Sequence, residues 1–168
     1  MKKNKIRFIS ILTVLVLTCC FLMPPKIVQA KDNKKYTVNY VASKEYKNKW
    51  GIKKITKTEA KMLAQIVYLE ARGEGDKGEQ AVIEVVLNRV SSKKFPGSIK
   101  KVLSQKNQFS TYKIRNKAKV REKELRNIYK VLNGQTNILK NKKTVFFGTR
   151  PYNKKIQLKY KHHYFCRY

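Results

Sequence analysis

Residues 68–90 read YLEARGEGDKGEQAVIEVVLNRV, and the rest of the chain is organised around this stretch. Five of the ten acidic residues of a very basic protein lie inside it, namely Glu70, Glu74, Asp76, Glu79 and Glu84. A carboxylate that takes part in chemistry therefore has few candidates outside this stretch.

A helix with a defined start is predicted to lead into this stretch. Thr56 is suited to be its N-cap, and Glu59, three residues later, completes the capping-box pattern. Apolar residues then recur at helical spacing from Leu63 to Val67, and Glu70 continues the same stripe. We therefore expect Glu70 near the C-terminal end of this helix, on or beside its apolar face.

That placement suits Glu70 to act as a general acid. Apolar surroundings disfavour a charged carboxylate, and a helix C-terminus adds partial negative charge, so both effects would raise the pKa of Glu70. A carboxyl group that stays protonated near neutral pH can protonate a leaving group, as glycosidases require. The alternative is that Glu70 is a boundary residue that reaches water or pairs with Arg72 or Lys77.

A second helix is predicted to open at Asp76, where Glu79 repeats the capping-box pattern. Glu84 falls on the side of this helix away from the apolar residues, and we expect it to be solvated. The spacing of the apolar residues predicts a broad buried face, made by Val82, Ile83, Val86, Leu87 and Val90.

The remaining elements are short. Ser98 is expected to cap a helix that reaches Leu103, and residues 120–132 form an amphipathic helix that Gly134 ends. Residues 144–147 are typical of a strand, and residues 156–168 of a closing strand or an extended tail. The fold class is therefore mainly α (α+β), with a short C-terminal β element.

The chain is expected to consist of a leader, an arm and one small domain. Residues 1–30 have a basic start, an apolar run and a small-residue cleavage site, as in a signal peptide, so the mature chain would begin at Lys31. The alternative is that the leader is retained as an anchor. Residues 31–55 are rich in Lys and Asn and are interpreted as a basic linker or arm, and residues 56–168 as the catalytic domain.

The net charge predicts a polyanionic environment. The chain carries a formal charge of +30, and removal of the leader takes away five basic residues and no acidic one, which leaves +25. Nucleic acid, anionic membrane and anionic cell wall are the usual partners of such a chain. Because export is expected, we favour the cell wall over nucleic acid, with membrane contact through the leader only.

The histidines and cysteines do not indicate a metal site. His162 and His163 are adjacent, a spacing that rarely serves one ion, and no HExxH pattern occurs. Cys166 is the one cysteine outside the leader, so the mature chain has no intrachain disulfide. Its pairing with His163 is too weak a pattern for a thiol hydrolase. We expect no metal and no cofactor, and a structural or cleft-edge position for the histidines.

Several motifs together resemble a known family. YLEARGE, GEQAVIEVVLNRV, FPGSIKKVL and NQFS follow one another between Glu59 and Ser110, and HHYF at residues 162–165 is a weaker match. In this order they resemble the spore-cortex-lytic cell-wall hydrolase family, the group that contains SleB and CwlJ.

The resemblance implies a lysozyme-like or lytic-transglycosylase-like domain that acts on peptidoglycan glycan strands. Glu70 would be the catalytic acid. Gln108, Phe109 and Ser110 would form one wall of a sugar cleft, and His163 would lie at its edge. Phe109 can also be interpreted as a buried plug, and both interpretations can hold together. The implied setting is the cell wall or the spore, in cortex breakdown or wall remodelling.

The shortage of carboxylates bears on the mechanism. Glu74 lies one turn beyond Glu70, so in a helix it would project from the same side, and we expect it to support the bend by accepting backbone N–H groups or Arg72. A single acid suffices in a lytic transglycosylase, where the muramic acid C6 hydroxyl is the nucleophile. Two alternatives remain: a hydrolytic muramidase or glucosaminidase with Glu74 as second carboxylate, and a non-catalytic wall-binding protein. An activating partner, the oligomeric state and the choice of cortex or vegetative wall stay open.

Overall fold

The computed structural model describes residues 34–168, which form one compact unit. The predicted signal peptide, residues 1–30, lies outside the described residues. Within 34–168, no helix has the length and apolar character needed to cross a membrane.

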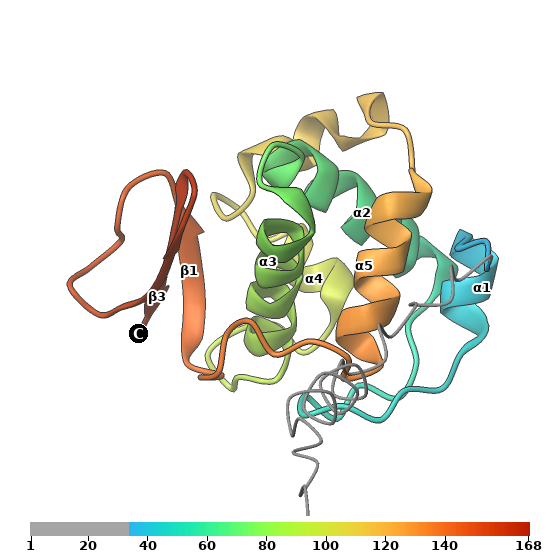
Figure 1. Cartoon of the computed structure of the whole chain (residues 1–168), viewed down its shortest axis with the longest axis horizontal. Helices are drawn as coiled ribbons and strands as arrows, with labels where there is room; N and C mark the ends of the chain where they lie inside the picture. Colours follow the sequence, from blue (N-terminus) through green and yellow to red (C-terminus); the bar gives the residue numbers. More distant parts are fainter. Residues whose placement is uncertain (1–33) are drawn as a thin grey trace, which may run out of the picture. The chain divides into compact units, whose positions relative to one another are not determined.

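The helices pack around two central members, α2 and α3, which are joined by a short bend (Figure 1). α2 spans Lys57–Ala71, α3 spans Gly75–Val90, and α5, Glu122–Leu132, packs against both. Two shorter helices complete the set, α1 at Val38–Ser43 and α4 at Ile99–Leu103, together with a 3-10 helix, η3, at Ser110–Lys117.

The start of α2 agrees with the prediction. Glu59 N donates to Thr56 Oγ1 over 3.1 Å, and Thr56 N donates to Glu59 Oε2 over 3.1 Å, so both hydrogen bonds of the capping box are present. The helix ends at Ala71, so Glu70 lies in its last turn.

The predicted start of α3 was wrong. The N-cap is Glu74, and no side chain caps the helix. Glu79 is buried and accepts hydrogen bonds from Lys123 Nζ and Asn127 Nδ2, both on α5 and both at 2.7 Å. Burial raises the pKa of Glu79, and the bonds from Lys123 and Asn127 oppose that rise. Glu79 therefore joins two helices instead of closing a cap.

The expected solvation of Glu84 was also wrong. Its carboxylate is fully buried and accepts the backbone N–H groups of Ile138 and Leu139, at 2.8 and 2.7 Å. Lys49 Nζ lies 3.6 Å from Oε2 of Glu84. This carboxylate therefore fixes the segment between α5 and the sheet by supplying acceptors for backbone donors that would otherwise be buried unpaired.

Residues 34–55, expected to be a linker or arm, belong to the folded unit. Their aromatic and apolar side chains enter the core, and Trp50 Nε1 donates to the buried Asn88 Oδ1 of α3 over 2.7 Å. The folded domain therefore begins well before residue 56. The aromatic residues decide this, because burial of a Tyr or Trp ring stabilises the folded state. The neighbouring lysines can keep their charged ends in water at the same time.

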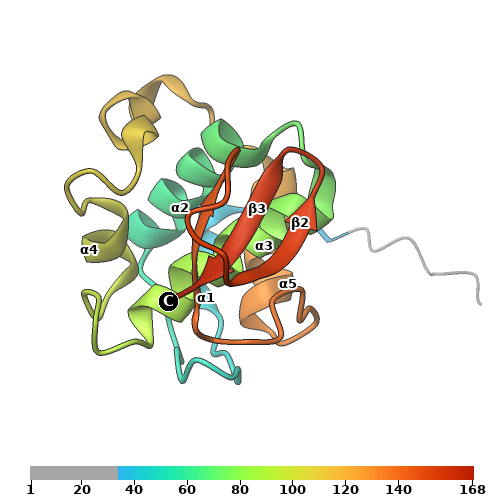
Figure 2. The same cartoon turned by 90° about the vertical axis from the view of Figure 1, so that its left-hand side faces the viewer.

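The C-terminal residues form a three-stranded antiparallel sheet of order β1-β3-β2 (Figure 2). β1 spans Thr144–Gly148, β2 Ile156–Tyr160 and β3 His163–Arg167. The predicted single closing strand is thus a hairpin, which turns at Lys161 with a φ of 46°. The mainly helical class with a small C-terminal sheet is confirmed.

Replacement of Glu84 by Ala should lower the free energy of unfolding by about 3 kcal/mol, because it leaves the half-buried N–H of Ile138 and the buried N–H of Leu139 without an acceptor. Urea denaturation measures this difference. Glu45→Ala is the matched control, since Glu45 pairs with Lys54 at the surface and its side chain is 76% exposed. Equal stability of the two variants would contradict the structural importance of Glu84.

Candidate active site

Glu70 lies where α2 meets η3, and its carboxylate is half-buried. Thr111 Oγ1 donates to Glu70 Oε1 over 2.5 Å, across 41 residues of sequence. Thr111 belongs to η3, which packs along α2. The polar loop predicted to form a cleft wall therefore does reach the predicted catalytic residue. The hydroxyl that makes the contact, however, was not singled out from the sequence.

Glu70 differs from the other carboxylates of residues 34–168 in what it contacts. Its hydrogen bonding is limited to one side-chain hydroxyl. The others accept backbone N–H groups or face cationic side chains, as seen for Glu45, Glu59, Glu74, Asp76, Glu79, Glu84, Glu122 and Glu124. Among the described carboxylates, Glu70 is thus the one whose single hydrogen-bond partner is a side-chain hydroxyl.

Glu74 is buried and held by the turn between β2 and β3. Its Oε2 accepts the backbone N–H of His162 at 3.2 Å, and its Oε1 lies 2.9 Å from His162 Nδ1. Burial acts to raise the pKa of Glu74, but the hydrogen bonds from the ring and backbone of His162 outweigh it, and the pKa is lowered. The expected partner Arg72 instead donates to Tyr68 Oη at 3.1 Å.

The bend beside Glu74 is closely packed. Lys161 Nζ donates to the carbonyl of Gly73 over 3.2 Å, a second link between the sheet turn and the bend. A Cβ atom at Gly78 would collide with Cβ of Glu74, so only glycine fits one turn into α3. Glu74 therefore links the bend to the turn of the sheet, through a partner that the sequence did not indicate.

His163 lies close enough to Glu70 and Glu74 for both carboxylates to act on its pKa. Its ring is buried against Phe147 and Phe165, with ring centroids 5.5 and 6.1 Å away. Burial lowers the pKa of His163, while the negative charges of Glu74 and Glu70 act in the opposite direction. Its Nδ1 has no hydrogen-bond partner among the described residues. His162, by contrast, is exposed and is committed to Glu74.

Phe109 is buried beneath the predicted cleft wall. Its ring lies 6.0 Å from that of Phe147 and 5.2 Å from the Arg89 guanidinium. The plug interpretation therefore describes Phe109, whose ring supports the wall from below. Gln108 is half-buried beside it and Ser110 is exposed, so these two are the parts of the wall open to a ligand.

Arg89 is a supporting residue whose contacts the sequence did not reveal. Its Nε donates to the carbonyl of Val145 in β1 over 2.7 Å, and its Nη1 has no partner in the described part of the chain. Burial lowers the pKa of Arg89 to about 10. One buried guanidinium thus connects α3, the first strand and the ring of Phe109.

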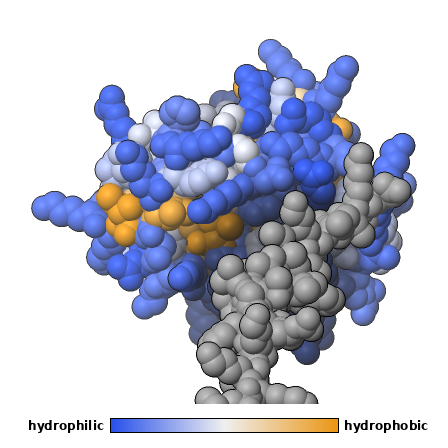
Figure 3. Space-filling view, in the orientation of Figure 1, coloured by the Kyte–Doolittle hydropathy of each residue, from blue (hydrophilic) through white to orange (hydrophobic). Residues whose placement is uncertain are grey.

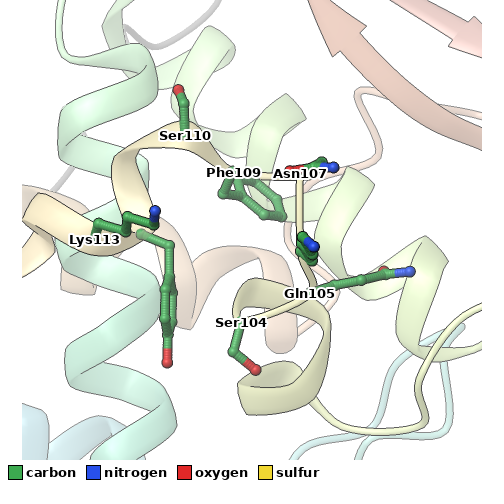
Figure 4. A pocket seen from close by; sticks show the side chains of 8 residues that line it. Ser104, Gln105, Asn107, Phe109, Ser110 and Lys113 are labelled. Atoms are coloured by element: carbon green, nitrogen blue, oxygen red, sulfur yellow. The ribbon is translucent and has the colours of Figure 1, made fainter.

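A hollow of about 590 Å³ adjoins the same wall (Figure 4). It lies between the end of α4 and η3, and its lining includes Gln105, Ser110 and Lys113. Glu70 is not among the lining residues. We therefore locate the candidate active site by the carboxylate, and the hollow is a neighbouring surface. Residues 34–168 contain no cluster of three His, Cys, Asp or Glu side chains able to hold a metal ion.

Comparison with known proteins gives two kinds of match. Residues 73–166 match the model of the Cell Wall Hydrolase family, a range that begins three residues after Glu70. No curated protein matches the chain.

Two solved structures share the fold. The catalytic domain of the germination-specific lytic transglycosylase SleB from Bacillus anthracis is 24% identical, with a TM-score of 0.57, and the alignment covers 67% of this chain and 97% of that one. The catalytic domain of Bacillus cereus SleB is also 24% identical, with a TM-score of 0.59 and coverage of 67% and 91%. Since the family match spans more than half of the sequence, the chain belongs to the cell wall hydrolase family.

Proposed function

We propose that this protein cleaves peptidoglycan glycan strands between muramic acid and glucosamine as a lytic transglycosylase, with Glu70 as its acid and base. Membership of the cell wall hydrolase family supports peptidoglycan as the substrate class. The observation that carries the proposal is the state of Glu70, which has one hydroxyl partner while the other described carboxylates are engaged in structure.

One carboxylate is sufficient for this reaction. Glu70 gives its proton to the glycosidic oxygen as the bond to C1 of muramic acid breaks. The same carboxylate then takes the proton of the muramic acid C6 hydroxyl as that oxygen bonds to C1, which leaves a 1,6-anhydro end and regenerates the acid. Thr111 donates to Oε1 of Glu70, so Oε2 is the oxygen available to carry the proton.

The state of Glu74 favours this mechanism over hydrolysis. A two-carboxylate hydrolase needs its second group about 5 Å or more away, across the scissile bond, and open to water or sugar. Glu74 is buried and both its oxygens are engaged by His162. Asp76 pairs with Arg126 on α5, so its carboxylate is directed toward that helix. Neither Glu74 nor Asp76 is therefore placed to act as the water-activating base that a hydrolytic mechanism requires.

We place the protein at the cell wall or spore, after export. The strongly basic composition suits retention on an anionic wall, and the fold is shared with SleB catalytic domains. Gln108, Ser110 and the uncharged His163 are the proposed sugar contacts, with Phe109 supporting the wall that presents them.

Mass spectrometry of muropeptides released from purified peptidoglycan tests the reaction. We expect products that end in 1,6-anhydromuramic acid. Reducing ends would contradict the transglycosylase and favour a muramidase or glucosaminidase. No release from either cortex or vegetative wall would favour the non-catalytic binding protein.

Glu70→Gln should reduce glycan cleavage by at least about a thousandfold, because an amide cannot transfer the proton. The amide oxygen can still accept from Thr111, so the folded structure and wall binding should persist. Release of muropeptides measures the first effect and sedimentation with sacculi the second. Glu45→Gln is the matched control, and continued cleavage by the Glu70 variant would rule out this acid.

Thr111→Val should lower kcat about tenfold with little change in KM, since it removes one hydrogen bond that orients the Glu70 carboxyl. Thr111→Ser restores the hydroxyl and should restore kcat. Steady-state kinetics on a soluble glycan fragment provide both constants. An equal loss in the Val and Ser variants would show that the methyl group, and not the hydroxyl, is what matters.

His163 should make folding stability depend on pH near neutrality. Its folded pKa lies below the ordinary 6.5 because of burial, so below pH 6.5 the unfolded chain binds the proton first. Stability is therefore full above pH 6.5 and falls as the pH drops from there through the folded pKa. Urea denaturation at pH 7 and pH 5 measures the fall, and His163→Phe should reduce it. An identical fall in both proteins would contradict the burial of a neutral His163.

A further inference from the structure

The two faces of the sheet have different surroundings. Strand register places Phe147 opposite Phe165, and both rings pack toward the helices together with Leu158 of β2. Phe146 pairs with Cys166, and Lys159 with Tyr164, so these residues belong to the opposite face. We call the two sides the inner and the outer face.

The outer face is turned away from the helices, and the loop between β1 and β2 covers part of it, because Cys166 is fully buried with its Sγ 3.8 Å from the carbonyl oxygen of Asn153. Figure 2 looks onto the sheet, and the helices lie behind it. Tyr152, in the loop between β1 and β2, is 69% exposed, and Ile156 is 44% exposed. Figure 3, in the orientation of Figure 1, views the sheet from its edge and shows an apolar patch in the hydrophilic surface on that side of the molecule. Exposed apolar groups that gather on one face commonly mark a binding surface.

Two of the aromatic rings on this face are stacked face to face, with the exposed ring of Tyr152 over that of the half-buried Phe146. The ring of Tyr152 stacks on that of Phe146, with centroids 3.9 Å apart and planes only 13° from parallel. Tyr164 lies on the neighbouring strand, with Lys159 Nζ 5.5 Å from its ring centroid. We call Phe146, Tyr152 and Tyr164 the aromatic platform. A flat ring with one exposed side suits the C–H face of a sugar ring, and a tyrosine adds a hydroxyl at its edge.

The charges around the aromatic platform are of one sign. No acidic residue occurs after Glu124 in the sequence. Arg150, Lys154 and Lys155 are exposed in the loop that carries Tyr152, and Lys159 lies on the outer face itself. A ligand that fits this surface must therefore combine flat apolar faces with negative charge.

We propose that the aromatic platform is a second binding site for peptidoglycan, which holds an anionic stretch of glycan strand away from the one being cut at Glu70. The exposed ring faces receive the sugar faces, and the surrounding lysines and arginine receive the free carboxylates of the stem peptides, or of lactyl groups that carry no peptide. This proposal rests on the proposed function for its substrate class. It differs in its residues, because the platform lies on the outer face and His163 and Phe147 lie on the inner face.

The site would keep the enzyme on an insoluble polymer between cleavage events. Cations alone attract any polyanion at long range and lose that attraction in salt. Stacked rings add a short-range contact that salt does not screen. Retention through the aromatic platform should therefore persist at ionic strengths that remove non-specific binding.

The test measures binding without cleavage. The purified protein carrying Glu70→Gln is sedimented with peptidoglycan sacculi freed of phosphate-containing wall polymers. Addition of Tyr152→Ala should raise the dissociation constant about fivefold, the loss expected for one aromatic stacking contact. Tyr152→Phe keeps the ring and should bind like the parent. Ile114→Ala is the matched control, an apolar residue 46% exposed on η3.

Cleavage provides the second measurement. With Glu70 intact, Tyr152→Ala should slow release from sacculi and leave the rate on a short soluble glycan unchanged. Unchanged affinity of Tyr152→Ala for sacculi overturns the proposal. So does a loss seen only with sacculi that retain phosphate polymers, or only with anionic phospholipid vesicles. If the parent releases no product yet Tyr152→Ala weakens binding, the proposed reaction fails and the second site stands.

Discussion

The carboxylate of Glu74 is the constraint on which the site depends, because it joins the bend after Glu70 to the turn of the sheet. Two oxygens of one buried side chain receive the backbone and the ring of His162, 88 residues away in sequence. The lowered pKa of Glu74 keeps it charged, so this link holds near neutral pH. The last turn of α2 and the start of β3 are thereby fixed relative to one another.

Most of the few carboxylates described in this very basic chain have structural partners. Glu79 joins α3 to α5, and Glu84 fixes the segment that leads to the sheet. Both of these buried carboxylates are paired, with cations, a side-chain amide or backbone donors, because an unpaired buried charge is strongly destabilising. Glu70 remains outside this arrangement, and within residues 34–168 its hydrogen bonding is limited to Thr111. The proposal that Glu70 is the catalytic acid rests on this difference.

The site is assembled from distant parts of the chain, and its supports are hydrophobic. Phe109 carries the cleft wall on the inner face of the sheet, where Phe147 receives it and Arg89 lies against it. The outer face bears a second set of rings in contact with solvent. A sheet of only three strands thus supports the proposed active site with one face and carries the proposed second glycan site on the other.

The sequence by itself determined the helical class, the capping box of α2 and the place of Glu70 in the last turn of that helix. These follow from short-range spacing, which a linear pattern records directly. Tertiary structure alone decided the rest. The hydropathy pattern of α3 wrongly predicts that Glu84 is solvated. The pattern cannot record the backbone N–H groups of Ile138 and Leu139 that bind this carboxylate, because they lie more than fifty residues away in sequence. Residues 34–55 resemble a linker in composition, and only the burial of residues such as Trp50 shows that they belong to the core. The contact of Thr111 with Glu70 exists only because η3 packs along α2.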